Sequence, residues 1–295
     1  MYMNKILLII PIFMSTILSY CSNNNGHSSQ PIPDDYSYGV FLGATSEDTN
    51  KLRNSKYQKL VLDIDEFSIQ DIWSIADKGK EIYAYLSIGS LENYRDYYED
   101  YRDITFMDYD NWPDERWVDV SSTAWQEHIV SEANRINHFL GPDTINGVFI
   151  DNLDVYYIAS EVYLESTEEF VEGIYEGCLT IISELSKVFD SLLVNSGSTL
   201  LERMHDENNN LLNKIGGYVQ ECVFSNIVDY EHDIFSRQNN EDHEYYKSVI
   251  EMMSNYSDIL LLEYTTDKSV ISDIVEYAST YEYHYFISSH VDLKA

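Results

Sequence analysis

Short apolar runs that end in an acidic or amide residue recur along this chain, and they constrain its fold more than any other feature. The clearest is the segment GVFIDNLD at 147–154, where an apolar run of four residues is followed by Asp151 and Asn152. Such a run is typical of a parallel strand buried on both faces. A second run, GYVQ at 217–220, ends in Glu221. Buried strands that deliver single acids at their carboxyl ends predict an α/β barrel, because such barrels carry their chemistry at that face.

Eight strand-like runs alternate with helical patterns, which is the number that a closed parallel barrel needs. Apolar residues spaced three and four apart, as at Ile69, Ile72 and Ile75, indicate the helices, and Ser122 and Thr167 stand where helix N-caps are expected. The sequence therefore predicts a single-domain (β/α)8 barrel. The predicted strands are 38–42, 60–63, 82–87, 148–151, 191–195, 218–221, 259–264 and 283–288, and the predicted helices are 69–78, 123–140, 168–189, 245–255 and 269–281.

One connection is far longer than a simple strand–helix link. Residues 89–121 follow the third strand and are rich in Tyr, Asp and Trp. A long loop in a compact domain is usually functional or disordered, and this one is too aromatic for disorder. We expect an inserted loop that covers the mouth of the barrel; WVDV at 117–120 is alternatively a ninth strand.

The N-terminus predicts export. Lys5 precedes an apolar run over 6–18 that is too short for a comfortable membrane span and is typical of a signal-peptide core. The run ends in LSYC, which resembles a bacterial lipoprotein signal with Cys21 as the lipidated residue, although Tyr20 replaces the small residue usual at that position. We expect a signal peptide at 1–20, a polar tether at 21–35 and the barrel at 36–295, in a secreted or cell-surface protein that meets the membrane only through its lipid anchor.

The amino-acid composition limits the kinds of molecule that the protein is expected to bind. The net charge of −33 argues against nucleic acid, because phosphate binding needs concentrated Lys and Arg. It favours a neutral or cationic partner, or serves solubility alone. Tyr occurs 26 times, and its flat apolar face with a polar tip suits sugar rings as well as ordinary packing.

Asp151 and Glu221 form the leading pair of catalytic candidates. Two facing carboxylates suit glycosidic bond cleavage, in which one is the acid and the other the nucleophile or base. For a single strand-end acid the simpler interpretation is a helix cap or an ion pair, but the repetition over several strand ends favours a site. Arg95 is expected to pair with one of the acids. Further substrate-binding candidates at the same mouth are Asp63, Asp65, Asn152, Asp154, Asn195 and Glu263, with the aromatic residues Tyr85, Tyr94, Trp112, Tyr156 and Tyr264.

Several common chemistries find no support. The chain has no G-x-S-x-G, P-loop, G-x-G-x-x-G or H-E-x-x-H segment, and Cys178 and Cys222 show no metal-ligand spacing. We expect no metal, no cofactor and ordinary buried cysteines.

These segments together resemble glycoside hydrolase family 114, the endo-α-1,4-polygalactosaminidases, from about residue 39 to the C-terminus. The resemblance implies a (β/α)8 barrel and an exported enzyme that cleaves within α-1,4-linked galactosamine polymers without a cofactor, with Asp151 and Glu221 as its catalytic carboxylates. Gln220 stands where the family often has Asn, and Asn195-Ser196 replaces a more usual Lys-Asn pair. The matching segments are VLDID at 61–65, AYLSIG at 84–89 with ENYR at 92–95, WVDV at 117–120, GVFIDNLD at 147–154 and QEC at 220–222.

Within that resemblance we assign Glu221 as general acid/base and Asp151 as nucleophile, and we expect the short carboxyl separation of a retaining enzyme. A de-acetylated galactosamine polymer is cationic near neutral pH, so a chain at −33 would attract it. Two alternatives stay open: a non-catalytic sugar-binding lipoprotein on the same barrel, and a barrel hydrolase that acts on a different polysaccharide, because sugar choice depends on loop contacts.

Overall fold

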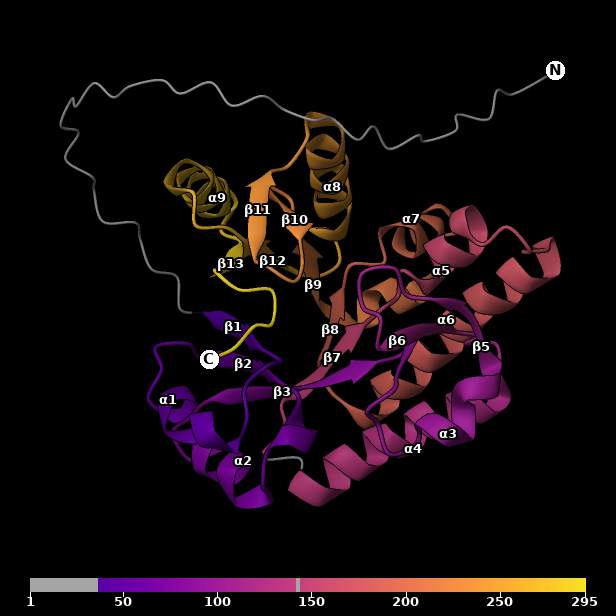
Figure 1. Cartoon of the computed structure of the whole chain (residues 1–295), viewed down its shortest axis with the longest axis horizontal. Helices are drawn as coiled ribbons and strands as arrows, with labels where there is room; N and C mark the ends of the chain where they lie inside the picture. The colour runs from indigo at the N-terminus through magenta and orange to yellow at the C-terminus, as the bar shows by residue number, and fades with distance from the viewer. Residues whose placement is uncertain (1–36, 142–143) are drawn as a thin grey trace. The chain divides into compact units, whose positions relative to one another are not determined.

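Eight parallel strands form one sheet whose order around the barrel follows their order along the chain (Figure 1). The computed structural model describes residues 37–141 and 144–295. The predicted signal peptide and tether, with Cys21, lie outside these residues. The strands are β1 (Tyr38–Phe41), β2 (Lys59–Leu62), β3 (Glu81–Ser87), β7 (Gly147–Asp151), β8 (Leu192–Asn195), β9 (Ile215–Glu221), β12 (Asp258–Tyr264) and β13 (His284–Ser288).

The first and last strands meet, so the sheet curls into a barrel. Each neighbouring pair from β1 to β13 is parallel, for example Ile150 opposite Val194, and the register of the β8–β9 pair shifts between Leu192 and Leu193. β1 lies against β13, where the rings of Phe41 and Phe286 have centroids 5.2 Å apart. The strands are buried almost throughout because both of their faces are covered. Their carboxyl ends therefore share one rim, and that rim is where a barrel can hold a site.

Helices connect the strands and surround the barrel (Figure 1). The predicted N-cap Thr167 is confirmed, since its side chain accepts a hydrogen bond from Phe170 N; Ser122 stands at the N-cap of its helix without such a bond. The α-helices are α1 (Thr49–Arg53), α2 (Ile69–Ala76), α3 (Tyr98–Tyr101), α4 (Thr123–Leu140), α5 (Val155–Tyr157), α6 (Glu168–Val188), α7 (Ser198–Asp206), α8 (Asn240–Met253) and α9 (Lys268–Tyr281). Short helical turns are η1 (Ser46–Asp48), η2 (Ile64–Glu66), η3 (Arg102–Ile104), η4 (Ile158–Val162) and η5 (Asn210–Lys214).

The eight-stranded barrel predicted from sequence is confirmed, and each strand boundary lies within three residues of its prediction. Two of the longer helices differ. α8 begins five residues earlier than predicted, because Asn239 caps it and the acidic residues Glu241 and Asp242 occupy its first turn. α7 was not predicted, since it starts after the left-handed Gly197 without a side-chain cap that the sequence could reveal.

The segment after β3 is an ordered insertion rather than an irregular loop. It contains a three-stranded antiparallel sheet in the order β4-β6-β5, which includes the alternative strand predicted near Trp117. Gly89 lies at its start, where a Cβ atom would stand 1.8 Å from the carbonyl oxygen of Asn152, so only glycine lets the insertion approach the end of β7 this closely. The three strands are β4 (Ser90–Glu92), β5 (Thr105–Asp108) and β6 (Glu115–Val118).

A hairpin that the sequence did not predict follows β9. Its strands are β10 (Ser225–Asp229) and β11 (Ile234–Arg237), paired antiparallel. Like the insertion, it follows a strand's carboxyl end, so both segments stand at the same rim of the barrel.

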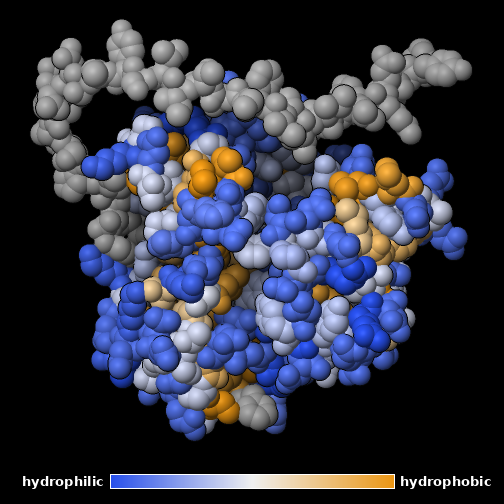
Figure 2. All heavy atoms as spheres, viewed as in Figure 1, coloured by the Kyte–Doolittle hydropathy of each residue, from blue (hydrophilic) through white to orange (hydrophobic). Residues whose placement is uncertain are grey.

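The surface seen in Figure 2 is mostly hydrophilic, in keeping with the chain's net charge of −33. Within the described residues, none of the helices combines the length and apolar character needed to cross a membrane.

Candidate active site

A cavity of about 770 Å³ opens at the carboxyl ends of the strands. Residues from β7, β8 and β9 form its floor, and the insertion and the β10–β11 hairpin form its walls. Ten acidic side chains line it, and no Lys, Arg or His does so among the described residues. The cavity is therefore strongly electronegative. The ten acids are Asp63, Glu92, Asp110, Asp114, Glu115, Asp151, Asp154, Glu221, Asp242 and Asp292.

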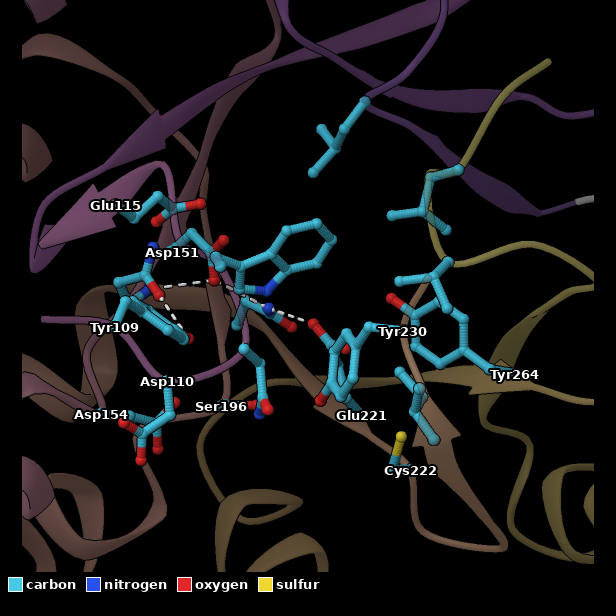
Figure 3. A pocket seen from close by; sticks show the side chains of 18 of the residues that line it. Tyr109, Asp110, Glu115, Asp151, Asp154, Ser196, Glu221, Cys222, Tyr230 and Tyr264 are labelled. Atoms are coloured by element: carbon cyan, nitrogen blue, oxygen red, sulfur yellow. Dashed lines mark hydrogen bonds between the residues drawn. The ribbon is translucent and has the colours of Figure 1, made fainter. Parts of the chain in front are cut away.

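Asp151 and Glu221 are brought together by one amide (Figure 3). Asp151 ends β7 and Glu221 ends β9, while Asn195 ends β8 between them. Because Asn195 Nδ2 lies 2.9 Å from Asp151 Oδ1 and 2.6 Å from Glu221 Oε1, these two oxygens are at most 5.5 Å apart. Their closeness follows from strand order, which puts the three residues side by side on one rim.

The residue after each of these three strand ends adopts a left-handed backbone. The φ angles are 65° at Asn152, 54° at Ser196 and 56° at Cys222. This conformation is uncommon for residues other than glycine, although Asn tolerates it. Residues in such conformations cluster at functional sites, where the surrounding structure holds them. Here each one turns the chain sharply away immediately after a side chain that faces the cavity.

Asn152 anchors the floor through every polar atom of its side chain. Its Nδ2 donates to Ser87 Oγ and Ser90 Oγ, both at 3.0 Å, and its Oδ1 accepts from the Tyr109 hydroxyl at 3.2 Å. Its backbone N–H donates to Asp151 Oδ1 at 2.9 Å. Asn152 thus joins β3, the insertion and β7, and it fixes the carboxylate of Asp151.

Different neighbours shift the pKa values of the two carboxyl groups. Burial raises the pKa of Glu221 to about 7, and the negative charge of Asp151 adds to that rise. Burial also raises the pKa of Asp151, but hydrogen bonds from Asn195, Asn152 and Tyr85 oppose it. The charge of Asp151 therefore helps Glu221 keep a proton near neutral pH.

A second pair of carboxylates stands on the wall above Asp151. Strand pairing places Glu92 of β4 directly opposite Glu115 of β6. Burial raises the pKa of Glu115 to about 8, and the negative charges of Glu92 and Asp151 raise it further. The hydroxyl group of Ser90 donates a hydrogen bond to the Glu115 carboxyl group at 2.5 Å. Like charges directly across a sheet repel each other, so a proton on Glu115 stabilises this pair.

Arg95 neutralises part of the negative charge of this wall from the side that faces away from the cavity. As predicted, it forms ion pairs: it contacts Glu92, and its Nη2 lies 2.8 Å from Asp63 Oδ2. Its guanidinium carbon lies 5.1 Å from the centroid of the Tyr94 ring and 6.0 Å from that of Tyr85. Arg95 therefore orders the acids and aromatic rings of this wall without lining the cavity itself.

Aromatic side chains surround the acids. Tyr85, Tyr94, Trp112 and Tyr264 all line the cavity, as predicted from sequence. Trp112, at the β5–β6 turn, is 39% exposed, and its ring packs edge-on against Tyr230 of the hairpin with centroids 5.6 Å apart. The tips of the insertion and the hairpin thus meet at the rim. Flat rings at a polar rim are suited to stacking against sugars.

Three of the predicted site residues lie elsewhere. Asp65 does not line the cavity; it pairs with Arg135 at 2.9 Å and with Arg95 Nη1 at 3.5 Å. The Tyr156 hydroxyl accepts from Arg203 at 3.2 Å, against helices α6 and α7. Glu263 is fully buried, and its carboxylate accepts from the backbone N–H groups of residues 224 and 225, so it holds the start of the hairpin. Strand-end position alone did not distinguish these structural roles from contact with the cavity.

The structure brings all the other predicted residues to the cavity: Asp63, Tyr85, Tyr94, Trp112, Asp151, Asn152, Asp154, Asn195, Glu221 and Tyr264. It adds Glu92, Tyr109, Glu115 and Tyr230, which the sequence did not single out. The position of the insertion after β3 was the available signal for the first three of these. No signal was available for Tyr230, because the hairpin itself was not predicted.

Cys178 and Cys222 are free thiols. Cys178 is buried as predicted, but the prediction is wrong for Cys222, which is partly exposed because it follows β9 at the rim and lines the cavity. In the described part of the chain, no group of three or more His, Cys, Asp or Glu side chains is arranged to hold a metal ion.

Solved structures share this architecture. The glycoside hydrolase domain of PelA from Pseudomonas aeruginosa is 15% identical, with 87% of this chain and 96% of that chain covered and a TM-score of 0.68. Ega3 from Aspergillus fumigatus, solved in complex with galactosamine, is 15% identical over 92% of this chain and 98% of that one, with a TM-score of 0.66. An α-galactosidase from Thermus thermophilus is 8% identical over 85% of this chain and 58% of that one, with a TM-score of 0.52. At these identities the likeness shows a shared fold.

An α/β barrel with two carboxylates on one rim, at the ends of strands separated by a single strand, is an arrangement found in barrel glycoside hydrolases. The sequence profile of glycoside-hydrolase family GH114 matches residues 22–192. The chain belongs to this family and is a glycoside hydrolase. No curated protein sequence matches it.

Proposed function

We propose that this protein hydrolyses α-1,4-linked galactosamine polysaccharide within the chain, with Asp151 and Glu221 as the catalytic carboxylates. The observation that carries the proposal is the pairing of these two side chains through Asn195 at the floor of a cavity lined by ten acids and no bases among the described residues. The complex of Ega3 with galactosamine, on the same fold, supports the choice of sugar.

The separation of the two carboxylates supports a retaining mechanism. Retaining glycosidases have carboxyl groups about 5–5.5 Å apart, whereas inverting enzymes need roughly 6.5–9.5 Å to admit a water molecule. The nearest oxygens of Asp151 and Glu221 are at most 5.5 Å apart, given their distances of 2.9 and 2.6 Å from one nitrogen. Asp151 attacks the anomeric carbon and forms a glycosyl–enzyme intermediate, which water then hydrolyses.

The difference in protonation supports the division of labour. Glu221, with a pKa raised by burial to about 7, keeps the proton that the departing glycosidic oxygen requires. After that transfer the Glu221 carboxylate accepts a proton from the attacking water. Asp151, held by hydrogen bonds from Asn195 and from its own neighbour Asn152, is ionised and is aimed at the sugar.

The charge of the cavity supports a cationic substrate. A galactosamine residue without its acetyl group carries a positive charge near neutral pH, and those of the ten acidic side chains that are ionised attract it. Attraction over more than about 8–10 Å is screened at physiological salt, so the acids that line the cavity contribute more than the distant surface charge does.

We also propose that the protein is exported and anchored through Cys21. The support is the apolar run at 6–18 followed by LSYC and a polar segment. An enzyme that acts on a polysaccharide outside the cell needs an export signal of this kind.

The test is incubation of the purified protein with de-acetylated and with N-acetylated galactosamine oligomers, with the products identified by mass spectrometry. We expect internal cleavage of the de-acetylated oligomers. Cleavage of the acetylated oligomers alone would show that the substrate is a different polysaccharide. Binding without cleavage of either would favour a non-catalytic sugar-binding protein.

A further inference from the structure

Tyr264 differs from the exposed aromatic residues of the rim. It ends β12, the strand beside β9, and it lines the cavity although its side chain is only 4% exposed, against 39% for Trp112. Its ring also packs on Phe235 of the hairpin, with centroids 6.3 Å apart. A ring that is buried and covered in this way offers little flat surface to a sugar. Stacking therefore does not explain the place of Tyr264 in the site.

The pairing of β12 with β9 brings Tyr264 and Glu221 to the same face of the sheet. Glu221 lies opposite Leu262, and side chains alternate along a strand, so Tyr264 shares the face of Leu262 and Glu263 has the other one. The Tyr264 hydroxyl group donates a hydrogen bond to the Glu221 carboxyl group. Figure 3 shows this hydroxyl group turned toward the centre of the cavity, where Glu221 lies.

The start of the hairpin holds Tyr264 in place. Ser225 Oγ accepts a hydrogen bond from the backbone N–H of Tyr264 at 3.0 Å and donates one to Glu263 Oε2 at 2.5 Å. Ser225 and Glu263 are fully buried. A series of buried hydrogen bonds thus connects Glu263 through Ser225 and Tyr264 to Glu221. Side chains that are supported in this way keep the precise geometry that catalysis needs.

The reaction requires Glu221 to exist in two states. It is protonated when it gives its proton to the glycosidic oxygen, and it is ionised until the attacking water returns a proton. Burial and the negative charges of Asp151 and Asp154 disfavour the ionised state. Hydrogen bonds from Asn195 and Tyr264 favour it.

We propose that Tyr264 is a positioning residue, whose hydroxyl group holds the Glu221 carboxyl group and stabilises its ionised form between the two steps of the reaction. The inference rests on the proposed role of Glu221 as acid/base. It gives a function to the hairpin, which fixes the backbone of Tyr264 through Ser225 and its ring through Phe235.

The experiment titrates Glu221 directly. The purified protein is labelled with ¹³C at its glutamate carboxyl groups and followed by NMR through the neutral pH range, with Glu221→Gln to assign the signal. Tyr264→Phe keeps the ring and removes only the hydroxyl group. Because the hydrogen bond stabilises the ionised form, its loss should raise the pKa of Glu221 by at least about half a pH unit. Further titratable groups that interact with Glu221, and that these variants retain, are Tyr109, Cys222 and Tyr230.

A kinetic measurement accompanies the titration. In Tyr264→Phe the alkaline limb of kcat/KM for galactosamine oligomers should move to higher pH by the same amount, while the acid limb, which reports Asp151, stays in place. The amino groups of the substrate titrate equally for both proteins, so the difference between the midpoints belongs to the enzyme. A loss of packing alone would lower the rate without moving the midpoint.

Two further variants test the sign and the specificity of the effect. Tyr264→3-fluorotyrosine makes the hydroxyl group a stronger donor and should lower the pKa of Glu221. Tyr245→Phe is the matched control, because the Tyr245 hydroxyl group donates to a different glutamate, Glu202, at 2.8 Å outside the cavity. It should leave the pKa of Glu221 and the pH profile unchanged.

The outcomes separate this inference from the proposed function. If the pKa of Glu221 is the same in wild type, Tyr264→Phe and Tyr264→3-fluorotyrosine, the inference is wrong, whether or not the protein cleaves galactosamine oligomers. If no oligomer is cleaved but the pKa of Glu221 moves as expected, the hydrogen bond stands and the proposed function fails. If Tyr264→Phe does not fold, the fluorinated protein decides.

Discussion

Asp151 and Glu221 come from strands 70 residues apart in sequence, yet their carboxylates accept hydrogen bonds from the same side-chain nitrogen, at 2.9 and 2.6 Å. The nitrogen belongs to Asn195, on the strand between them. This arrangement holds both acids at the floor of the cavity and limits how far apart they can move.

Removing either carboxylate should abolish turnover. Asp151→Asn removes the nucleophile and Glu221→Gln removes the proton donor, and positioned acids and bases typically contribute about 10²–10⁴-fold in rate. We expect losses of at least 10²-fold in kcat with an unchanged circular dichroism spectrum. Asp206→Asn is the matched control, because Asp206 is an exposed residue of α7 that does not line the cavity. A variant of either catalytic residue with near-normal turnover would refute the assignment.

The activity should fall as the pH rises through about 7. Glu221 is active as an acid only while protonated, and burial raises its pKa to about 7. On the acid side, activity falls as Asp151 becomes protonated, so kcat/KM should follow a bell-shaped profile. With an aryl leaving group that needs no proton, Glu221→Gln should lose the alkaline limb. An alkaline limb that survives in this variant would assign the proton donor to another group.

Stability should also decrease with rising pH. Burial raises the pKa of Asp154 to about 6, of Glu221 and Glu263 to about 7, and of Glu115 to about 8. The folded state then holds more protons than the unfolded chain above pH 4–5, so stability is lost as the pH rises to about 8. We expect a melting temperature several degrees lower at pH 8.5 than at pH 5.5.

The contribution of one group to this pH dependence can be isolated. Glu115→Gln imitates the protonated side chain and should reduce the difference in melting temperature between the two pH values. Glu99→Gln changes an exposed glutamate and should leave the difference as it is in the wild type. Equal melting temperatures at pH 5.5 and 8.5 in the wild type would contradict the prediction.

Trp112 should contribute to substrate binding and little to folding. Its ring is 39% exposed at the rim and packs against Tyr230. Trp112→Ala should raise KM for oligosaccharides by about 2–13-fold, the range expected when a stacking contact of about 0.5–1.5 kcal/mol is lost. Trp73→Ala, which removes an exposed tryptophan of α2 outside the cavity, is the control. Equal KM values for the two variants would remove Trp112 from the binding surface.

Cys21 should carry a lipid. The protein should partition into the detergent phase and the membrane fraction, and mass spectrometry of the mature N-terminal peptide should find a modified Cys21. Cys21→Ser should release the protein from the membrane fraction without loss of activity. A soluble wild-type protein with an unmodified Cys21 would contradict the lipid anchor, and only the prediction of export would stand.

Much of the fold could be predicted from local sequence. Buried parallel strands are continuous apolar runs, and the helices between them have apolar residues at helical spacing, so both kinds of element can be recognised in short windows. All eight barrel strands were found this way. The helices α1, α3, α5 and α7, the strands β4 and β5 of the insertion, and the β10–β11 hairpin were missed. α7 lacks a side-chain cap, and the exposed strands of the hairpin lack a buried run.

The same strand-end rule selected Asp151, Glu221 and Glu263, but it could not separate their roles. Asp151 and Glu221 face the cavity, whereas Glu263 accepts hydrogen bonds from the backbone of the hairpin and is fully buried. The partner that decides its role, Ser225, lies 38 residues away and in a segment that was not predicted.

The sequence alone thus determined the barrel, the order of its strands and the rim at which the acids gather, because each depends on patterns within a few residues. Only the tertiary structure decided which acids share the cavity and in what state of protonation. Glu92 and Glu115 become neighbours through pairing of β4 with β6, and Asn195 stands between Asp151 and Glu221 because β8 lies between β7 and β9. Burial and the charges of distant neighbours set these pKa values, and neither exists until the chain has folded.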